Sequence, residues 1–276
     1  MNITRSEGFI LNLSLIIGWV LSVGLIVFGI MFDMDTFSVN AGKMMNFIEI
    51  KSFLITVGGT VGCLVASFPM SYLAGTGKRF MLALKPKKYD PTKYITEIVD
   101  YAQVARTRGL LALEESANQC SDPFMKSALM MIVDANDPDK VRGMLDDTIM
   151  FMCERHDQGR AFFEKGVGIF PAFGMLGTLV GLINMLNGLD LSSGDTSALT
   201  GGMAVALITT FYGSLFANVV FAPLGMALKN LHEDELLCMQ IIEEGVLAIA
   251  GGSNPRYIQE KLEFMLPKSK HTSDKK

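Results

Sequence analysis

The sequence predicts an all-α membrane protein with four transmembrane helices, a large helical cytoplasmic domain between the second and third of them, and a cytoplasmic C-terminal helix. Composition is the first reason, because 50% of the 276 residues are hydrophobic, only 19% are charged, and the mean hydropathy is +0.35. These values lie on the membrane side of ordinary soluble domains. The second reason is that four segments without Asp, Glu, Lys or Arg are long enough to cross a bilayer.

Each of these four uncharged segments is expected to form one transmembrane helix. About 20 helical residues cross the hydrocarbon layer, and a helix satisfies its own backbone hydrogen bonds there. Proline removes one helical hydrogen bond, so Pro69, Pro171 and Pro223 predict kinks or helix boundaries. The first segment is expected to be retained, because no small-residue cleavage site follows its apolar run. The segments are residues 8–32, 52–77, 166–189 and 199–228.

Basic residues predict the orientation of the four helices. Lys78, Arg79 and Lys85 follow the second segment, and Lys229 follows the fourth. Lys and Arg are enriched in cytoplasmic loops, so these sides are expected to face the cytoplasm. The loop between the third and fourth segments holds the acidic residues Asp190 and Asp195 and no basic residue, as expected of an outer loop. Both chain termini are therefore expected in the cytoplasm.

The charged segments outside the membrane are expected to be helical. Apolar residues recur at helical spacing in residues 94–105 and 129–133. Asp122 and Asp137 each precede a proline and are expected to cap or turn the chain between short helices. The predicted organisation is residues 1–77 for the first two transmembrane helices and the outer loop, 78–165 for the cytoplasmic domain, 166–228 for the third and fourth transmembrane helices, and 229–276 for the C-terminal helices and tail.

The transmembrane segments hold no ionisable side chain other than tyrosine and cysteine. Ion-coupled membrane proteins usually place a carboxylate or histidine in the ion path. A complete proton-driven machine is therefore not expected from this chain alone, although the chain could form the wall of a path whose carboxylate comes from another subunit. Gly174, Gly177 and Gly181 would let another helix approach closely, either from another subunit or from within the same chain.

Hydroxyl groups in the third and fourth segments are the candidate ion ligands. Thr178, Thr209 and Thr210 could each bond the preceding turn of their own helix, or they could line a cavity and replace part of the hydration shell of a small cation. These hydroxyls predict a site at Thr178 and Thr210 that could hold a sodium ion transiently. No fixed metal site is expected. The carbonyls freed by Pro171 and Pro223 could accept in the pathway or simply mark kinks.

Several other functional classes are excluded. The net charge is −4 and the sequence has no long block of basic residues, so no surface for binding nucleic acid is expected. Catalysis is not expected, because the three histidines have no metal-ligand spacing and no Gly-rich phosphate loop follows a strand. No cofactor is expected either, and the four cysteines form no CxxC pair. The histidines are His156, His232 and His271, and the cysteines are Cys63, Cys120, Cys153 and Cys238.

Five stretches of the sequence carry motifs in a characteristic order and spacing. They are residues 171–181 (PAFGMLGTLVG), 204–213 (AVALITTFYG), 105–115 (ARTRGLLALEE), 154–159 (ERHDQG) and 244–256 (EGVLAIAGGSNPR). In these motifs the sequence resembles the MotA and PomA stator proteins of the bacterial flagellar motor, within the MotA/TolQ/ExbB superfamily, and the similarity covers most of its length.

The resemblance implies a function and a set of partners. It implies a subunit of the bacterial inner membrane that forms a homo-pentamer around a dimer of a MotB-like partner, whose single membrane helix carries the ion-binding aspartate. The flow of H+ or Na+ would then turn the ring and drive the rotor for motility and chemotaxis. It implies that Pro171 and Pro223 couple conformational change and that Gly174, Gly177 and Gly181 pack against partner helices. Thr178 and Thr210 match hydroxyl positions of sodium-driven members, which favours sodium.

The resemblance also implies a contact with FliG, the switch-complex protein of the rotor. Arg106, Glu114 and Glu115 match the charged rotor-binding residues of the family. Residues eight apart on one helix lie about 80° apart around its axis, so Arg106 and Glu114 are expected to share one exposed face of a single helix. Thr107 departs from the sodium-driven pattern, in which a second basic residue often occupies this position, while Arg108 is basic one residue later.

Two alternative functions compete with this interpretation. An ExbB- or TolQ-type energiser of outer-membrane processes would usually have three spans and its large cytoplasmic portion after the first. In this sequence the large loop follows the second of four predicted spans. A self-contained secondary transporter would be expected to show internal repeats and charged residues inside the membrane, and this sequence shows neither.

Overall fold

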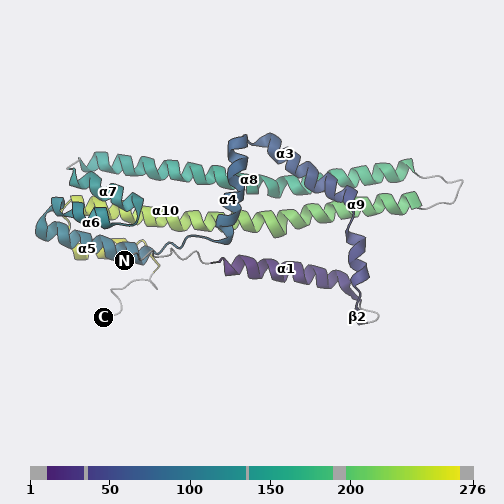
Figure 1. Ribbon diagram of the computed structural model, residues 1–276, viewed down its shortest axis with the longest axis horizontal. Helices are drawn as coiled ribbons and strands as arrows, with labels where there is room; N and C mark the ends of the chain where they lie inside the picture. Colours follow the sequence, from purple (N-terminus) through teal and green to yellow (C-terminus); the bar gives the residue numbers. More distant parts are fainter. Residues whose placement is uncertain (1–10, 34–36, 135–136, 189–196, 268–276) are drawn as a thin grey trace, which may run out of the picture. The chain divides into compact units, whose positions relative to one another are not determined.

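The computed structural model describes residues 11–33, 37–134, 137–188 and 197–267, and nearly all of them are helical (Figure 1). Four helices in this part of the chain are long and apolar enough to cross a membrane, which confirms the predicted fold class. The first is α1, and the second is built from α2, the π-helical segment η2 and α3. The third lies within α8, and the fourth runs through α9 and the π-helical segment η4 into α10. Their bounds are α1 Leu13–Met31, α2 Ile50–Phe53, η2 Leu54–Gly58, α3 Gly59–Ser67, α8 Pro138–Asn187, α9 Ser197–Leu215, η4 Phe216–Phe221 and α10 Ala222–Ala250.

The remaining elements are short. A two-stranded antiparallel hairpin pairs Phe32 with Val39 after α1. The other elements are a 3-10 helix in the outer loop, a helix that directly follows the second span, three helices before α8 and one helix at the C-terminal end. Their bounds are β1 Phe32–Asp33, β2 Ser38–Val39, η1 Ala41–Phe47, α4 Met70–Leu84, α5 Pro91–Arg108, η3 Leu110–Ala112, α6 Leu113–Gln119, α7 Pro123–Val133 and α11 Pro255–Glu263.

An Asp or Asn followed by proline begins four of these helices. Asp122 accepts hydrogen bonds from the backbone N–H groups of Phe124 and Met125, and Asp137 accepts one from Asp139, which confirms both predicted caps. Asp90 and Asn254 cap α5 and α11 in the same way. The cap satisfies free N–H groups of the first turn, and the following proline has no N–H that needs a partner.

The second span ends earlier than predicted. The sequence expectation of one helix over residues 52–77 is wrong, because α3 stops at Ser67 and α4 begins at Met70. Phe68 is extended, with φ −125° and ψ 140°, since the ring of Pro69 disfavours a helical conformation in the residue before it. The absence of charge therefore continues past the end of the span into a separate helix.

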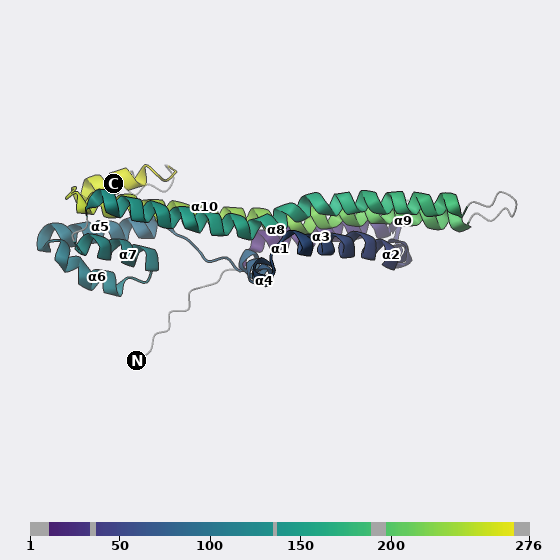
Figure 2. The same cartoon turned by 90° about the horizontal axis from the view of Figure 1, so that it is seen from above.

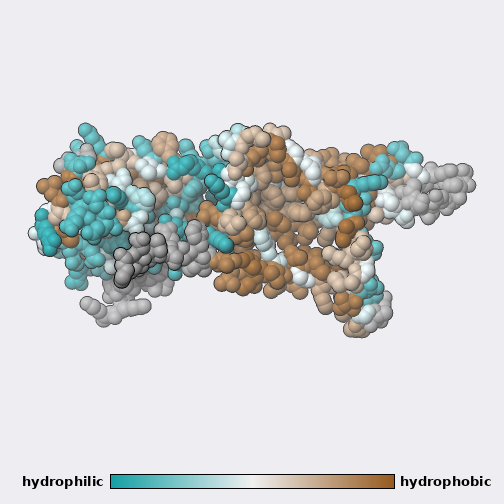
Figure 3. Space-filling model, in the orientation of Figure 1, coloured by the Kyte–Doolittle hydropathy of each residue, from teal (hydrophilic) through white to brown (hydrophobic). Residues whose placement is uncertain are grey.

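The chain divides into two compact units. The first comprises residues 1–87 and 157–229 and the second comprises residues 88–156 and 230–276. Hydrophobic residues gather on the unit that holds α1, α3 and α9, whereas the surface over α5, α6 and α7 is largely hydrophilic (Figure 3). Helix α4 and residues 157–229 belong to the first unit, together with the spans, while the cytoplasmic domain of residues 78–165 stays a prediction.

The second unit has its own hydrophobic core. Ile98 of α5, Leu113 of α6, Leu129 of α7, Ile241 of α10 and Ile258 of α11 are all fully buried in one cluster. Burying each such side chain stabilises the fold by about 1.5–3 kcal/mol. This core fixes the helices that carry the charged motif of residues 105–115.

Candidate functional site

The glycines of the third span form the contact between α8 and α9. A Cβ atom on Gly177 would lie 2.4 Å from the Cβ of Thr209, and one on Gly181 would lie 2.6 Å from the backbone oxygen of Gly202. A Cβ on Gly174 would lie 3.2 Å from the backbone oxygen of Thr209. All three therefore face a helix of the same chain, and α8 and α9 run side by side in both views (Figures 1 and 2). Of the two interpretations that the sequence left open, this placement favours packing within the chain.

Two hydroxyl groups meet at this contact. The Oγ1 atoms of Thr178 and Thr210 lie 2.6 Å apart. The backbone oxygen of Ala206 lies 3.1 Å from Thr178 Oγ1 and 3.2 Å from Thr210 Oγ1. Thr178 is half-buried and Thr210 is exposed, so the three oxygens sit at the edge of the contact rather than inside it. Three neutral oxygens brought this close together could supply part of the ligand shell of a small cation.

Thr209 is placed differently from the other two threonines. Its side chain is fully buried, packs against Gly177, and can donate to the backbone oxygen of Val205 at 2.9 Å. Its own backbone oxygen accepts a hydrogen bond from the Thr56 hydroxyl at 3.4 Å. The structure therefore separates the buried Thr209 from Thr178 and Thr210, with which the sequence grouped it.

The second span carries a row of hydroxyl groups that was not predicted from the sequence. Ser52, Thr56 and Thr60 are all fully buried. Ser52 and Thr56 approach the backbone oxygens of Val205 and Thr209 on α9. Their spacing of four residues was the available signal, because it places them on one face of a helix.

The two prolines occupy different helical environments. Pro171 lies inside α8, which continues without a break from Pro138 to Asn187, so it is not a helix boundary. Pro223 lies in the first turn of α10, directly after η4. A π-helical turn accommodates the missing N–H of proline by changing the hydrogen-bond register, and such turns occur often at functional sites.

The charged motif of residues 105–115 does not form a single helix, and that expectation is wrong. Arg106 lies in the last turn of α5, whereas Glu114 and Glu115 lie in the first turn of α6. Gly109 separates the two helices with a φ of +84°, a conformation that residues with a Cβ rarely adopt. All three charged side chains are exposed, and none forms an ion pair within the described part of the chain.

A second charge cluster, which was not predicted from the sequence, joins α8, α10 and α11. Arg142 contacts Glu243 at 3.7 Å and Glu244 at 3.2 Å, and Lys261 also pairs with Glu244. Burial and the nearby Asp146 raise the pKa of Glu243 to about 7, although Arg142 opposes the shift. The hydrogen bond from Lys261 and the contact with Arg142 lower the pKa of Glu244 despite its partial burial.

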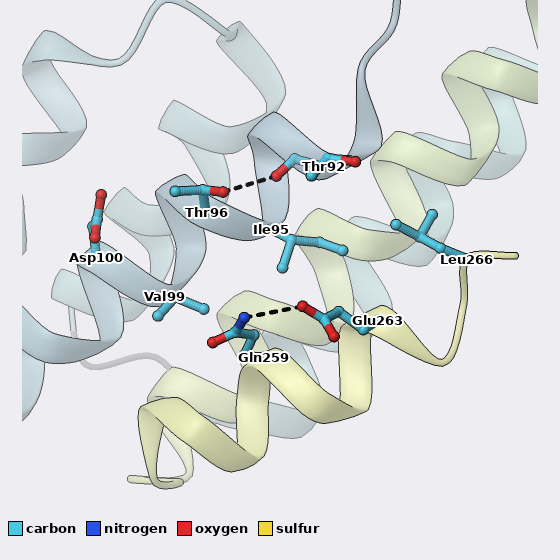
Figure 4. Close-up of a pocket in the computed structure, with 8 residues that line it drawn as sticks. All are labelled: Thr92, Ile95, Thr96, Val99, Asp100, Gln259, Glu263 and Leu266. Carbon is cyan, nitrogen blue, oxygen red and sulfur yellow. Dashed lines mark hydrogen bonds between the residues drawn. The ribbon is translucent and has the colours of Figure 1, made fainter. Parts of the chain in front are cut away.

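A small pocket lies between α5 and α11 (Figure 4). Gln259 donates to Glu263 at 2.9 Å on one side, and the Thr96 hydroxyl donates to the Thr92 backbone at 3.0 Å on the other. The cavity holds about 80 Å³, far below the 300–1,000 Å³ typical of sites for cofactors and drug-sized ligands. Among the residues that the structure describes, no cluster of three or more His, Cys, Asp or Glu could hold a metal ion. Asp190, Asp195 and His271 lie outside these residues.

Known proteins are similar to this chain over most of its length. Residues 116–241 match the model of the MotA/TolQ/ExbB proton channel family. Motility protein A of Borreliella burgdorferi is 36% identical over 261 residues, which cover 94% of this chain and 96% of that protein. The chemotaxis protein PomA of Vibrio alginolyticus is 38% identical over 229 residues, which cover 83% and 88%. A chain of the flagellar MotAB stator complex from Bacillus subtilis matches with a TM-score of 0.82 and 27% identity, over 95% of this chain and 98% of that one.

Proposed function

This chain belongs to the MotA/TolQ/ExbB proton channel family, and from this premise we propose that it is a flagellar stator subunit. It forms an ion channel with a MotB-like partner and converts ion flow into torque for bacterial motility. It is a protein of the inner membrane and not an enzyme. The observation that carries this proposal is the likeness to motility protein A and to the MotAB stator, which extends over nearly the whole chain.

A partner is needed because the spans lack an ion-carrying group. Residues 13–31, 52–67, 166–187 and 199–228 contain no Asp, Glu, His, Lys or Arg. A proton or sodium ion that crosses the hydrocarbon layer has to be held by charged or polar groups on the way. The single membrane helix of the MotB-like partner would supply that carboxylate, and no cofactor would be required.

We propose that five copies of this chain surround two copies of the partner. The exposed sides of α8 and α9 support this arrangement, because Met175, Leu179, Leu186, Met203 and Leu207 are all at least 46% exposed in the single chain. A ring would cover part of this apolar surface with neighbouring copies and with the partner helices. The inner side would then present the Thr178 and Thr210 hydroxyls to the partner carboxylate.

Sodium is the proposed driving ion, with the proton as the alternative. Sodium has to exchange water ligands for protein oxygens in a narrow path, whereas a proton can reside on one carboxylate and move along water. The convergence of Thr178 Oγ1, Thr210 Oγ1 and the Ala206 carbonyl supports sodium. Pro171 and Pro223, on the two helices of this contact, are the proposed positions of conformational coupling.

The rotor contact is proposed at the junction of α5 and α6, with FliG as the partner. Arg106, Glu114 and Glu115 are exposed there on either side of Gly109. Exposed charges without a partner in the same unit are free to pair with another protein. The basic residues after the second and fourth spans support a cytoplasmic position for this unit and for both chain termini.

Genetic complementation combined with purification tests this proposal. A strain that lacks this chain should assemble flagella without swimming, and its return should restore swimming only when the partner is present. The purified complex should have the mass of five copies of this chain and two of the partner. Normal swimming by the deletion strain, together with a defect in outer-membrane integrity, would instead indicate an energiser of the ExbB or TolQ type.

A further inference from the structure

Helix α4 runs across the direction of the spans. Figure 1 shows it crossing the direction of α1 and α9, and Figure 2 shows it nearly end-on. One side packs into the first unit, where Ala83 is buried with Leu15, Phe163 and Leu224. The ring of Phe80 stacks on Trp19 of α1 with centroids 6.4 Å apart. The helix is therefore fixed where the second span ends, in the orientation of a helix that lies along a membrane surface.

The opposite side of α4 is exposed and combines apolar with basic residues. Met70, Ala74, Lys78 and Met81 follow one another at helical spacing, and all are exposed. Met70 is 75% exposed and Met81 is 53% exposed. Leu82 borders the same side. These five residues are here called the α4 outer face.

Positive charge accumulates along and just after this helix. Residues 52–89 contain five basic residues and no acidic one. Lys78 and Lys85 are exposed and form no ion pair within the described part of the chain. Arg79 differs from them, because it turns inward and donates to the Tyr72 backbone oxygen at 3.0 Å. Two of the cationic groups are therefore available to an external anion.

We propose that the α4 outer face, together with Lys85, binds the headgroups of anionic phospholipids at the membrane surface. Methionine and leucine side chains enter the boundary between headgroups and acyl chains, while the lysine amines reach the phosphate groups. Clusters of basic residues next to a membrane span bind anionic lipids through such contacts. The lipid would thus hold the end of the second span at a fixed depth, which goes beyond the proposed stator function.

A second copy of the chain is the less favourable occupant. If two copies met face to face at the α4 outer face, the two Lys78 side chains would be brought together, and like charges without a counter-ion oppose such contact. An anionic headgroup has the complementary charge, and the neighbouring acyl chains accept the exposed methionines. The inference relies on the placement of α4 at a membrane surface, but not on ion flow.

Fluorescence quenching of Trp19 tests the proposal, because Trp19 is the only tryptophan of this chain and contacts α4 through Phe80. The assembled complex, with any tryptophan of the partner replaced by phenylalanine, is reconstituted in vesicles of phosphatidylcholine. Brominated phosphatidylglycerol or brominated phosphatidylcholine is then added in increasing amounts, since bromine quenches a nearby indole. We expect brominated phosphatidylglycerol to quench at lower mole fractions, and added salt to reduce this preference.

The variant Lys78→Gln/Lys85→Gln should lose most of this preference. Each lysine near an anionic surface is worth about a five-fold change in binding, so the loss of both should reduce the preference by about 25-fold. The pair Lys78→Arg/Lys85→Arg should retain it. The matched control Lys126→Gln/Lys140→Gln removes the same charge from the second unit and should change nothing.

Two results would overturn the proposal. One is an unchanged preference for phosphatidylglycerol in the Lys78→Gln/Lys85→Gln complex. The other is a change of subunit number in that complex with the lipid preference intact, which would assign the α4 outer face to a second copy of the chain. Neither result depends on ion flux or motility, so a failure here would leave the proposed stator function untouched.

Discussion

The hydroxyl oxygens of Thr178 on α8 and Thr210 on α9 lie 2.6 Å apart, and the Ala206 carbonyl lies within 3.2 Å of both. The two helices can approach this closely because glycines line the seam beside them, with Gly177 opposite Thr209 and Gly181 opposite Gly202. The glycine packing and the arrangement of the three oxygens therefore both belong to the contact between α8 and α9. Substitutions of the threonines and of the glycines alter the two features separately.

Removing either hydroxyl should weaken the response to sodium. Thr178→Ala or Thr210→Ala deletes one of the three converging oxygens, so we expect swimming to fail first at low external sodium and to recover partly as sodium is raised. Swimming speed as a function of sodium concentration at fixed pH measures this. The matched variants Thr178→Ser and Thr210→Ser keep the oxygen and should stay close to the wild type.

The same swimming assay in the presence of a protonophore tests the alternative, in which protons drive the motor. Wild-type cells that swim equally well without sodium and stop when the proton gradient collapses would show that protons drive the motor. The two threonines would then be helix-packing residues.

Adding a methyl group at Gly177, between α8 and α9, should destabilise the complex. In Gly177→Ala the new methyl group would lie 2.4 Å from the Cβ of Thr209, so α8 and α9 would have to separate. Overpacking of this kind costs about 1–3 kcal/mol. Gly168→Ala is the matched control on the same helix, since nothing lies within 4 Å of its added Cβ and alanine favours a helix by up to about 1 kcal/mol. Thermal unfolding of the purified complex should rank Gly177→Ala well below Gly168→Ala, and equal midpoints would contradict the close contact.

Reversing the charges at the junction of α5 and α6 should stop rotation without unfolding the protein. Arg106 and Glu114 are exposed and form no ion pair within the described residues, so Arg106→Glu/Glu114→Arg should change stability by less than about 1 kcal/mol. Swimming should be lost while expression and partner binding persist. Compensating charge reversals on FliG, the proposed rotor partner, should restore part of the torque, and loss of expression would instead indicate a structural role.

The pKa of Glu243 predicts a dependence of stability on pH. Burial and Asp146 raise this pKa from 4.5 to about 7, so the folded protein favours the protonated carboxyl group. The resulting stability is present below about pH 4.5 and is lost as the pH rises through 7. Glu243→Gln, which stays neutral, should therefore raise the free energy of unfolding at pH 8 by about 1–3 kcal/mol, and with it the unfolding midpoint. The midpoint of this variant should also change less between pH 5.5 and 8 than that of the wild type.

Glu244→Gln provides the contrast to Glu243→Gln. Lys261 and Arg142 lower the pKa of Glu244, so its charged form stabilises the fold above its ordinary pKa, and this stability is lost as the pH falls through the lowered value. The variant should be less stable than the wild type at pH 8. If the two variants changed the midpoint in the same direction at pH 8, the assignment of the two carboxylates would be wrong.

The sequence was sufficient for features that depend on local chemistry. Four spans followed from the length of the uncharged segments, and the caps at Asp122 and Asp137 followed from an acidic residue before proline. The end of the second span followed only in part, because Pro69 predicted a kink or boundary where α3 and α4 separate, whereas the absence of charge continues into α4.

Tertiary contacts decided the features that the sequence could not resolve. Whether a threonine faces another helix or an open edge depends on the rotation of α9, and so Thr209 is buried while Thr210 is exposed. Gly109 was visible in the sequence, but only its φ of +84° shows that it ends α5 between Arg106 and Glu114. The raised pKa of Glu243 arises from Asp146, a residue far away in the sequence that folding brings next to it.

The rotation of single tethered cells tests the central claim most directly. In a strain that lacks this chain, expression is induced while the partner is already present, and the speed of each motor is recorded over time. We expect stationary motors to restart and to accelerate in discrete steps of similar size, as one torque-generating complex after another joins the motor. Motors that turn at full speed before induction, or that remain still after the complex has assembled in the membrane, would contradict a role of this chain in generating torque.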